Sequence, residues 1–264
     1  MTTVDVHQHL WPEPLIRALE RRSERPRLRG SRLELTVEPD YEADLSAHDP
    51  ALRLARMDAQ GIDLAILSAA PTSGFYAHPE LRDAYHEGAL AIVAASGGRF
   101  RALSCGERLQ GFAGVCVGAP RLTAGCSDLL DELEASGDPL FVHPDVPAPA
   151  PTGVPWWWYA VCDYTAQMQA AWVAWLAREH ARTLPVVFAI FAGGGPVQLA
   201  RMGSRGYSPP PLANVYLDTA SYGPRELALA SRSQLVYGSD EPIVLAASSL
   251  DLELARNGAA LFAP

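Results

Sequence analysis

The chain has 264 residues, of which 48% are hydrophobic and 19% charged, so it is long enough to bury the core of one large domain or two small ones. Its formal net charge of −9 argues against a nucleic-acid partner, because phosphate binding needs clustered positive charge. All 21 basic residues are arginine, and the lack of lysine excludes Schiff-base catalysis and a two-metal site bridged by a carbamylated lysine.

Apolar runs and cysteine spacing bear on the cellular environment. No apolar run reaches the length of a membrane span, and a strand predicted from residue 2 leaves no room for a signal peptide, so we expect a cytoplasmic protein without a membrane partner. The four cysteines show no C-x-x-C spacing, and we expect them to be reduced and mostly buried. A cysteine-based zinc site is therefore not predicted.

The first predicted element carries two histidines. The stretch TTVDV is β-branched and strand-like, and His7 and His9 follow it with one residue between them. Residues i and i+2 of a strand point to the same face, so the two imidazoles would project together. That geometry suits a metal ion better than core packing, where each imidazole needs its own hydrogen-bond partner.

Residues 12–46 form an insertion after this strand, and the insertion is rich in arginine. Seven arginines fall between Arg17 and Arg32, a third of the basic residues of the chain. The favoured interpretation is a solvated helix face and loop, because such charged runs usually lie at the surface. The alternative is a clamp for a substrate carboxylate above an active site.

Short apolar stretches alternate with helical patterns along the rest of the chain. In the helical segment 162–181, Met168, Trp172, Trp175 and Leu176 recur at helical spacing and predict a core stripe. Two further helical segments are 49–61 and 78–97. With the opening strand TTVDVH, the predicted strands number eight and lie at 2–7, 61–70, 100–107, 111–120, 139–145, 184–192, 214–221 and 234–240.

Alternation of apolar strands with amphipathic helices is typical of a parallel sheet covered on both faces. Eight such units predict an α/β fold, a (β/α)8 TIM-type barrel formed by residues 1–264 as a single, somewhat distorted domain. The distortion is expected between Cys105 and Gly111, where the link is too short for a helix. A doubly wound open sheet is the alternative, but no G-x-G-x-x-G or Walker-type loop follows any strand.

Active sites of such barrels form at the carboxyl ends of the strands. Besides His7 and His9 on the first strand, the fifth predicted strand ends in His143 and the eighth in Asp240. Three neutral imidazoles and one carboxylate make a mononuclear site for zinc or a similar divalent ion.

The sequence resembles the amidohydrolase superfamily, and within it the amidohydrolase 2 branch that contains aminocarboxymuconate-semialdehyde decarboxylase. The segments that carry the resemblance are DVHQHLWP, MDAQGIDLAILS, PLFVHPD, AGGGPVQLARM, NVYLDTASYGP and LVYGSDEP, in the expected order along nearly the whole chain. The resemblance implies one metal ion held by His7, His9, His143 and Asp240, with Asp240 also the catalytic proton-transfer group. Zinc is the first choice of metal, with manganese or iron as alternatives, and a homodimer is expected.

One position departs from the family pattern. Members usually carry a histidine at the end of the sixth strand, just before a Gly-Gly pair, where this chain has Phe191, or Ile190 if the register slips by one. Loss of that histidine removes a general acid or base worth about 10²–10⁴-fold in rate. Asp145, two residues after His143, could substitute for it or could instead cap the following turn.

Four residues are predicted to bind substrate. Trp11 follows the histidine pair, Tyr222 follows the seventh strand, Asp145 lies beside His143, and Trp156 belongs to a proline-rich, lid-like loop expected at residues 145–161. The consecutive tryptophans of that loop could instead pack on the barrel rim or at a subunit interface. Together with the arginine segment, these side chains would suit a small, planar, carboxylated substrate.

Three functions remain open from the sequence. Hydrolysis by a metal-activated water leads, and non-oxidative decarboxylation by the same metal site is the first alternative. A catalytically degenerate barrel that binds a small molecule is the second, because Phe191 replaces the expected histidine. The remaining histidines, His48, His78, His86 and His180, are expected on the surface or in helices, and glycines 193–195 in a tight turn.

Overall fold

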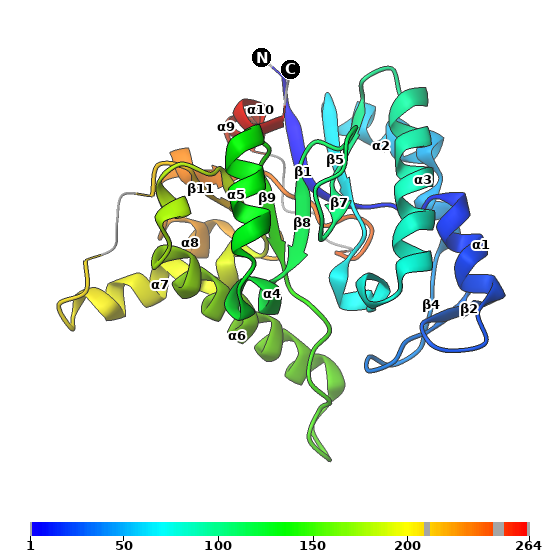
Figure 1. Ribbon diagram of the computed structural model, residues 1–264, viewed down its shortest axis with the longest axis horizontal. Coiled ribbons are helices and arrows are strands. Elements are labelled where there is room, and N and C mark those ends of the chain that lie inside the picture. The colour runs from blue at the N-terminus through cyan, green and yellow to red at the C-terminus, as the bar shows by residue number, and fades with distance from the viewer. Residues whose placement is uncertain (1, 209–211, 245–250, 263–264) are drawn as a thin grey trace.

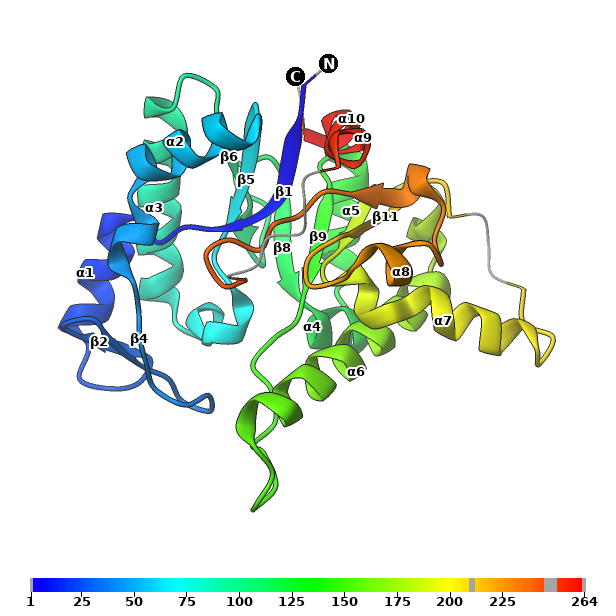
Figure 2. The same cartoon turned by 180° about the vertical axis from the view of Figure 1, so that it is seen from behind.

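The computed structural model describes residues 2–208, 212–244 and 251–262, and short strands lie at its centre (Figures 1 and 2). Backbone hydrogen bonds join these parallel strands into a ring. All side chains of the first two strands of the ring are buried, and the second of these strands, LAILS, is apolar except for its final serine. The ring strands are β1 (Val4–His9), β5 (Leu64–Ser68), β6 (Phe100–Ala102), β7 (Ser104–Cys105), β8 (Val115–Gly118), β9 (Leu140–His143), β10 (Val186–Phe188), β11 (Val215–Asp218) and β12 (Leu235–Val236).

Backbone hydrogen bonds carry the parallel pairing around the ring. One sheet has the order β1-β5-β6 and the other β12-β11-β10-β9-β8-β7. Leu103 alone separates β6 from β7, and its N–H donates to the Leu67 carbonyl at 2.8 Å, so these two count as one strand. On the other side, Val6 N–H donates to the Tyr237 carbonyl at 2.9 Å, which joins the first strand to the last. The predicted eight-stranded, distorted (β/α)8 arrangement is confirmed.

Helices surround the strands, with α1 to α3 on one side of β1 and α4 to α8 on the other (Figure 1). No helix lies between residues 106 and 114, as expected from the short link there. The helices are α1 (Glu13–Arg21), α2 (Pro50–Gln60), α3 (Pro79–Ala95), α4 (Ala119–Ala124), α5 (Ser127–Ser136), α6 (Trp156–Leu176), α7 (Phe191–Gly203), α8 (Pro224–Leu227), α9 (Leu252–Asn257) and α10 (Ala259–Phe262).

The insertion forms α1 and a small antiparallel sheet made of β2 (Arg27–Arg29), β3 (Arg32–Glu34) and β4 (Tyr41–Glu42). Its arginines bind acidic side chains and carbonyls close to them. Arg27 Nε donates to Glu34 at 2.6 Å, and Arg25 makes two bonds to the Asp40 carboxylate. These pairs favour the surface interpretation of the arginine run over a substrate clamp.

Helix α6 begins earlier than the sequence suggests. Residues 156–161 were expected in the lid-like loop 145–161, but α6 starts at Trp156, directly after Pro155. Proline is tolerated just before a helix because its φ is fixed and no intrahelical N–H is needed there, while the tryptophans that follow have adequate helix propensity. The loop therefore ends at Pro155. The predicted core stripe of this helix is buried as expected, with side chains of Met168, Trp172, Trp175 and Leu176 at most 5% exposed.

All four cysteines are free, and Cys105 and Cys116 are buried, whereas Cys126 is half-buried and Cys162 exposed. Among the described residues, no helix combines the length and the hydropathy needed to cross a membrane.

Candidate metal centre

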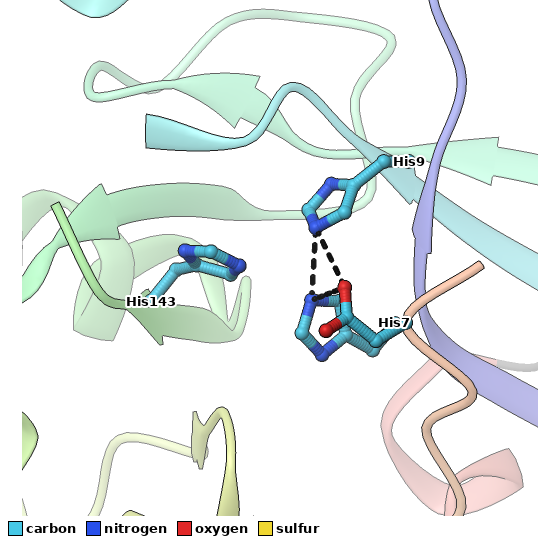
Figure 3. Close-up of side chains that lie close together, drawn as sticks. His7, His9 and His143 are labelled. Carbon is cyan, nitrogen blue, oxygen red and sulfur yellow. Dashed lines mark hydrogen bonds and ion pairs between the residues drawn. The ribbon is translucent and has the colours of Figure 1, made fainter. Parts of the chain in front are cut away.

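Four buried side chains converge at the carboxyl ends of the ring strands. His7 and His9 come from β1, His143 from the end of β9, and Asp240 from the segment after β12, and one ligand atom of each lies within 4.8 Å of those of the others. The three imidazoles point toward one another (Figure 3). The Nε2 atoms of His7 and His9 are 3.1 Å apart, and Asp240 Oδ1 lies 3.4 Å and 3.2 Å from them.

The Nδ1 atom of each imidazole lies within hydrogen-bond distance of an acceptor outside the cluster. His7 Nδ1 lies 2.6 Å from Asp218 Oδ2, and His9 Nδ1 lies 3.1 Å from the Ser68 carbonyl. His143 Nδ1 lies 2.8 Å from the carbonyl of Pro144. When Nδ1–H donates to such acceptors, the proton is fixed on Nδ1 and the Nε2 lone pair is free to bind a metal ion.

The backbone after β12 places Asp240 beside the histidines. Asp240 has a positive φ of 58°, and its N–H donates to the His7 carbonyl at 2.8 Å. Gly238 makes this approach feasible, since a Cβ there would lie 2.9 Å from the His7 Cβ. The glycine of the Gly-Ser-Asp motif thus allows the chain after the last strand to approach the first strand closely.

A buried polar network supports the same junction. Arg53 of α2 donates to Gln8 Oε1 at 3.0 Å and to the Ala47 carbonyl at 2.8 Å, and its Nε lies 3.6 Å from Glu241 Oε2. Gln8 Nε2 in turn donates to Asp5 at 2.8 Å. This network fixes the residues on either side of the ligands.

The electrostatics of the cluster favour a cation. Burial lowers the pKa of His7, but the charges of Asp240 and Asp218 together raise it to about 9. Burial raises the pKa of Asp240, yet the neighbouring imidazoles, His7 first, outweigh this and hold the pKa below its ordinary value. Burial, and then His7 and His9, push the pKa of His143 well below its ordinary value. The buried carboxylates of Asp240 and Asp218 thus attract positive charge to the cluster. Its three imidazole nitrogens and the Asp240 oxygen are a donor set that fits a divalent ion such as zinc.

Trp11 and Tyr222, two of the residues predicted to bind substrate, each pack against another aromatic ring. Trp11 is buried, and its ring stacks on His48 with centroids 4.4 Å apart. It also lines a cavity of about 640 Å³ among α1, α2 and α3. Tyr222 is half-buried and packs against Phe191, with ring centroids 5.4 Å apart. Substrate binding by Trp11 and Tyr222 stays a prediction.

Asp145 makes local hydrogen bonds in the segment that follows β9. Its Oδ1 accepts the Val146 N–H at 2.7 Å, and its own N–H donates to Gln167. Burial raises the pKa of Asp145. Gly118 leaves room for this carboxylate, because a Cβ there would lie 2.0 Å from Asp145 Oδ2. Trp156, the remaining predicted substrate residue, is half-buried in the first turn of α6.

The position of the missing histidine is filled by an apolar side chain. Phe191 is fully buried, and Ile190, Phe191 and Ala192 all have positive φ angles of 44°, 55° and 51°. Their left-handed backbone turns the chain sharply from β10 into α7. No ionisable side chain therefore occupies this strand end.

Sequence reasoning missed three features of the site. Asp218 ends β11 in the stretch NVYLDTAS, and the strand-end argument that singled out His143 applies equally to it. His48, expected on the surface or in a helix, is the last residue of a 3-10 helix (Leu45–His48), but its burial was missed: it is 7% exposed, and its Nδ1 accepts the Trp11 N–H. Tyr164 of α6 donates to Glu38 of the insertion, a contact between segments far apart in sequence.

Comparison with solved structures identifies the class of fold. No protein-family model and no curated protein matches the sequence. The chain is similar to the IDCase of Metarhizium anisopliae in its apo form, with 19% identity over 98% of this chain and 91% of that one and a TM-score of 0.69. An amidohydrolase II has 19% identity, 99% and 97% coverage and a TM-score of 0.70. The 4-oxalomesaconate hydratase LigJ from Rhodopseudomonas palustris has 13% identity, 99% and 95% coverage and a TM-score of 0.66.

These likenesses extend over the whole of this chain and nearly the whole of each neighbour. The protein therefore has the barrel fold of these three solved structures. At this level of identity the likeness concerns the fold, and the chemistry is argued from the site.

Proposed function

We propose that the protein is a metal-dependent enzyme of the amidohydrolase type that hydrolyses a small, carboxylated substrate. The observation that carries the proposal is the set of three Nδ1 contacts, to Asp218, the Ser68 carbonyl and the Pro144 carbonyl, which leave the Nε2 lone pair of each imidazole free where the three rings and Asp240 converge. A fold-stabilising histidine cluster would have no need for this common orientation.

His7, His9, His143 and Asp240 would hold one divalent ion, zinc being the best match to the donor set. A bound ion of this kind lowers the pKa of a water molecule toward neutrality and polarises a carbonyl group. Asp240 is ionised at neutral pH because its pKa is held low, so its carboxylate can accept a proton from the attacking water. Burial of all four side chains excludes bulk water, which strengthens each of these interactions.

Phe191 favours a second candidate function. The strand end that would carry a general acid or base holds a fully buried phenyl ring, so a barrel that binds a small molecule without turnover is the alternative. Non-oxidative decarboxylation, in which substrate oxygens bind the metal and a proton is delivered to carbon, uses the same ligand set. Detection of released carbon dioxide would distinguish decarboxylation from hydrolysis.

Metal content tests the proposal directly. Elemental analysis of chelator-free protein is expected to give about one divalent ion per chain in the wild type and in His180→Ala, which removes a half-buried imidazole paired with Asp131 away from the four ligands. His143→Ala is expected to lose the ion. No bound metal in the wild type, even after incubation with zinc, manganese or iron salts, would refute the proposal and leave the binding barrel.

A further inference from the structure

A hydrogen bond joins the insertion to helix α6. Glu38 lies in the loop between β3 and β4, and its Oε1 accepts from the hydroxyl group of Tyr164, 126 residues later in the chain. We call this contact the Glu38–Tyr164 bridge. Figures 1 and 2 show the insertion and the first half of α6 on the side of the molecule toward which β8 and β9 point. The bridge therefore lies on the side of the barrel where the four ligand residues meet.

Arginines brace the loop that carries the glutamate. Before the loop, Arg27 Nε donates to Glu34 at 2.6 Å, and at its other end Arg25 binds both carboxylate oxygens of Asp40. A bidentate arginine–carboxylate pair fixes the geometry of a contact as well as strengthening it. Residues 36–39 between these pairs belong to neither β3 nor β4. The arginine-rich insertion thus presents a short loop with a fixed base and a tip that is free to move.

The part of α6 that carries Tyr164 is fixed to the ends of two ring strands. Gln167 Oε1 accepts the N–H of Asp145, which follows β9, at 2.8 Å. Gln169 Nε2 donates at 2.7 Å to the carbonyl of Gly193, which follows β10. Both contacts come from the helical turns directly after Tyr164. The tyrosine is therefore held beside the strand ends, and its hydroxyl group faces the insertion.

The charge of Asp240 also acts on Tyr164. Burial, and then the charge of Glu38, raise the pKa of Tyr164 well above its ordinary value, and the charges of Asp163 and Asp240 add to this rise. Interactions between charges fade over about 10 Å in salt solution, so the hydroxyl group lies in the neighbourhood of the candidate metal centre. At neutral pH this group keeps its proton and donates a hydrogen bond to the Glu38 carboxylate.

The four ligand residues are closed off from solvent. His7 and His9 are each 1% exposed, His143 is 5% exposed and Asp240 8%. In a barrel of this kind, ligands approach from the carboxyl ends of the strands. The insertion follows β1 and α6 follows β9, so both segments border that approach. They are the two segments that the bridge joins.

We propose that the Glu38–Tyr164 bridge is a latch that bars the approach to the four buried ligands, and that the loop tip swings away from α6 before a small molecule enters. Lids of this kind exclude water from a site between openings. The arginine pairs at the base of the loop confine the movement to residues 36–39. As an entrance for substrate the latch rests on the proposed function, but as a barrier to the buried imidazoles it does not.

Carbethoxylation of His143 by diethyl pyrocarbonate tests the latch in metal-free protein. The reagent modifies a free nitrogen of a neutral imidazole, so its rate at His143, followed by mass spectrometry, reports access to the cluster. Tyr164→Phe removes only the hydroxyl group, and His143 is expected to react about tenfold faster in it than in the wild type. Glu38→Ala should have the same effect. Glu38→Gln retains an acceptor oxygen and should stay within about threefold of the wild type.

Two control variants make similar changes away from the bridge. Tyr159→Phe lies earlier in α6, and Glu42→Ala removes an exposed carboxylate of β4 that accepts from the Ser31 hydroxyl group. Both should leave the rate at His143 unchanged. The half-buried imidazole of His180 is the internal reference and should react equally in every folded variant. Circular dichroism checks the folding of each variant.

Two results would overturn the inference. One is an equal rate at His143 in the wild type, Tyr164→Phe and Glu38→Ala. The other is an equally large increase in Tyr159→Phe, because it would mean that the whole of α6 had loosened. The assay contains no metal, so a protein that binds no ion still shows whether the bridge bars access. The latch and the proposed function therefore fail separately.

Discussion

Asp218→Asn tests whether the contacts behind the imidazoles prepare the metal centre. Asp218 Oδ2 accepts from His7 Nδ1, and its Oδ1 accepts the Ala220 N–H at 3.1 Å. Asparagine keeps one oxygen for Ala220 but turns its NH₂ group toward His7. Because two donors cannot face each other, His7 would move its proton to Nε2, the atom that is needed for the metal.

The magnitude follows from the geometry of this contact. The two atoms are 2.6 Å apart and both side chains are fully buried, so no water can replace the carboxylate. Loss of such a partner behind a ligating histidine costs about 10–100-fold in metal affinity. That range corresponds to about 1.4–2.8 kcal/mol of binding free energy.

Competition with a chromophoric chelator measures the dissociation constant for zinc in both proteins. The matched control is Asp131→Asn, which makes the same change beside His180, where Oδ1 of the exposed Asp131 lies 2.7 Å from Nε2. The control should bind zinc as the wild type does. Equal affinity in Asp218→Asn and the wild type, with both folded, would show that the orientation of His7 does not depend on Asp218 and would refute the reasoning.

Two further predictions concern stability. Arg53→Met should lower the free energy of unfolding in urea by about 3–5 kcal/mol, because it leaves Gln8 and the Glu241 carboxylate without their buried cationic partner. His48 should make the protein less stable in acid, since burial, and then the charge of Arg53, lower its pKa from 6.5 to about 3. The unfolded chain binds a proton below pH 6.5 and the folded chain does not until about pH 3, so His48 should cost about 2 kcal/mol of stability between pH 7 and pH 5. His48→Asn, which retains an acceptor for the Trp11 N–H, should lose that part of the pH dependence.

Each of these predictions has a control. Arg56→Met removes an exposed arginine one turn further along α2 and should change the free energy of unfolding by less than about 0.5 kcal/mol. An Arg53→Met variant as stable as Arg56→Met would contradict the role assigned to the buried network. For His48, equal slopes of stability against pH in the wild type and in His48→Asn would mean that another group titrates in this range.

The ring of strands could be predicted because the physics that produces it is local. Strands buried on both sides need uninterrupted apolar residues, and the stretches at β5 and β9 meet that need with few polar interruptions. The parallel arrangement then brings the carboxyl ends of the strands together. The convergence of His143 with a histidine pair 134 residues earlier in the chain follows from that topology, and no local signal is required for it.

Other features depend on partners that sequence spacing does not reveal. The ion pairs of the insertion are formed in and beside a small sheet whose register no pattern fixes, so Arg25 could not be matched to Asp40 in advance. His48 is buried because Trp11 stacks on it, and stacking depends on side-chain direction. The start of α6 was placed too late because the prolines that precede Trp156 were taken to disrupt the following residues as well.

The contact of β1 with β12 and the segment after it has a consequence for synthesis of the protein. His7 and His9 leave the ribosome more than two hundred residues before Asp240, so the hydrogen bond from the Asp240 N–H to the His7 carbonyl must wait for the later segment. A nascent chain therefore lacks the Asp240 carboxylate while the residues between are being made, and the four side chains come together only as the barrel closes. Acquisition of metal by this protein would mark the end of folding, and truncated chains that lack the last strand would be expected to compete poorly for the ion.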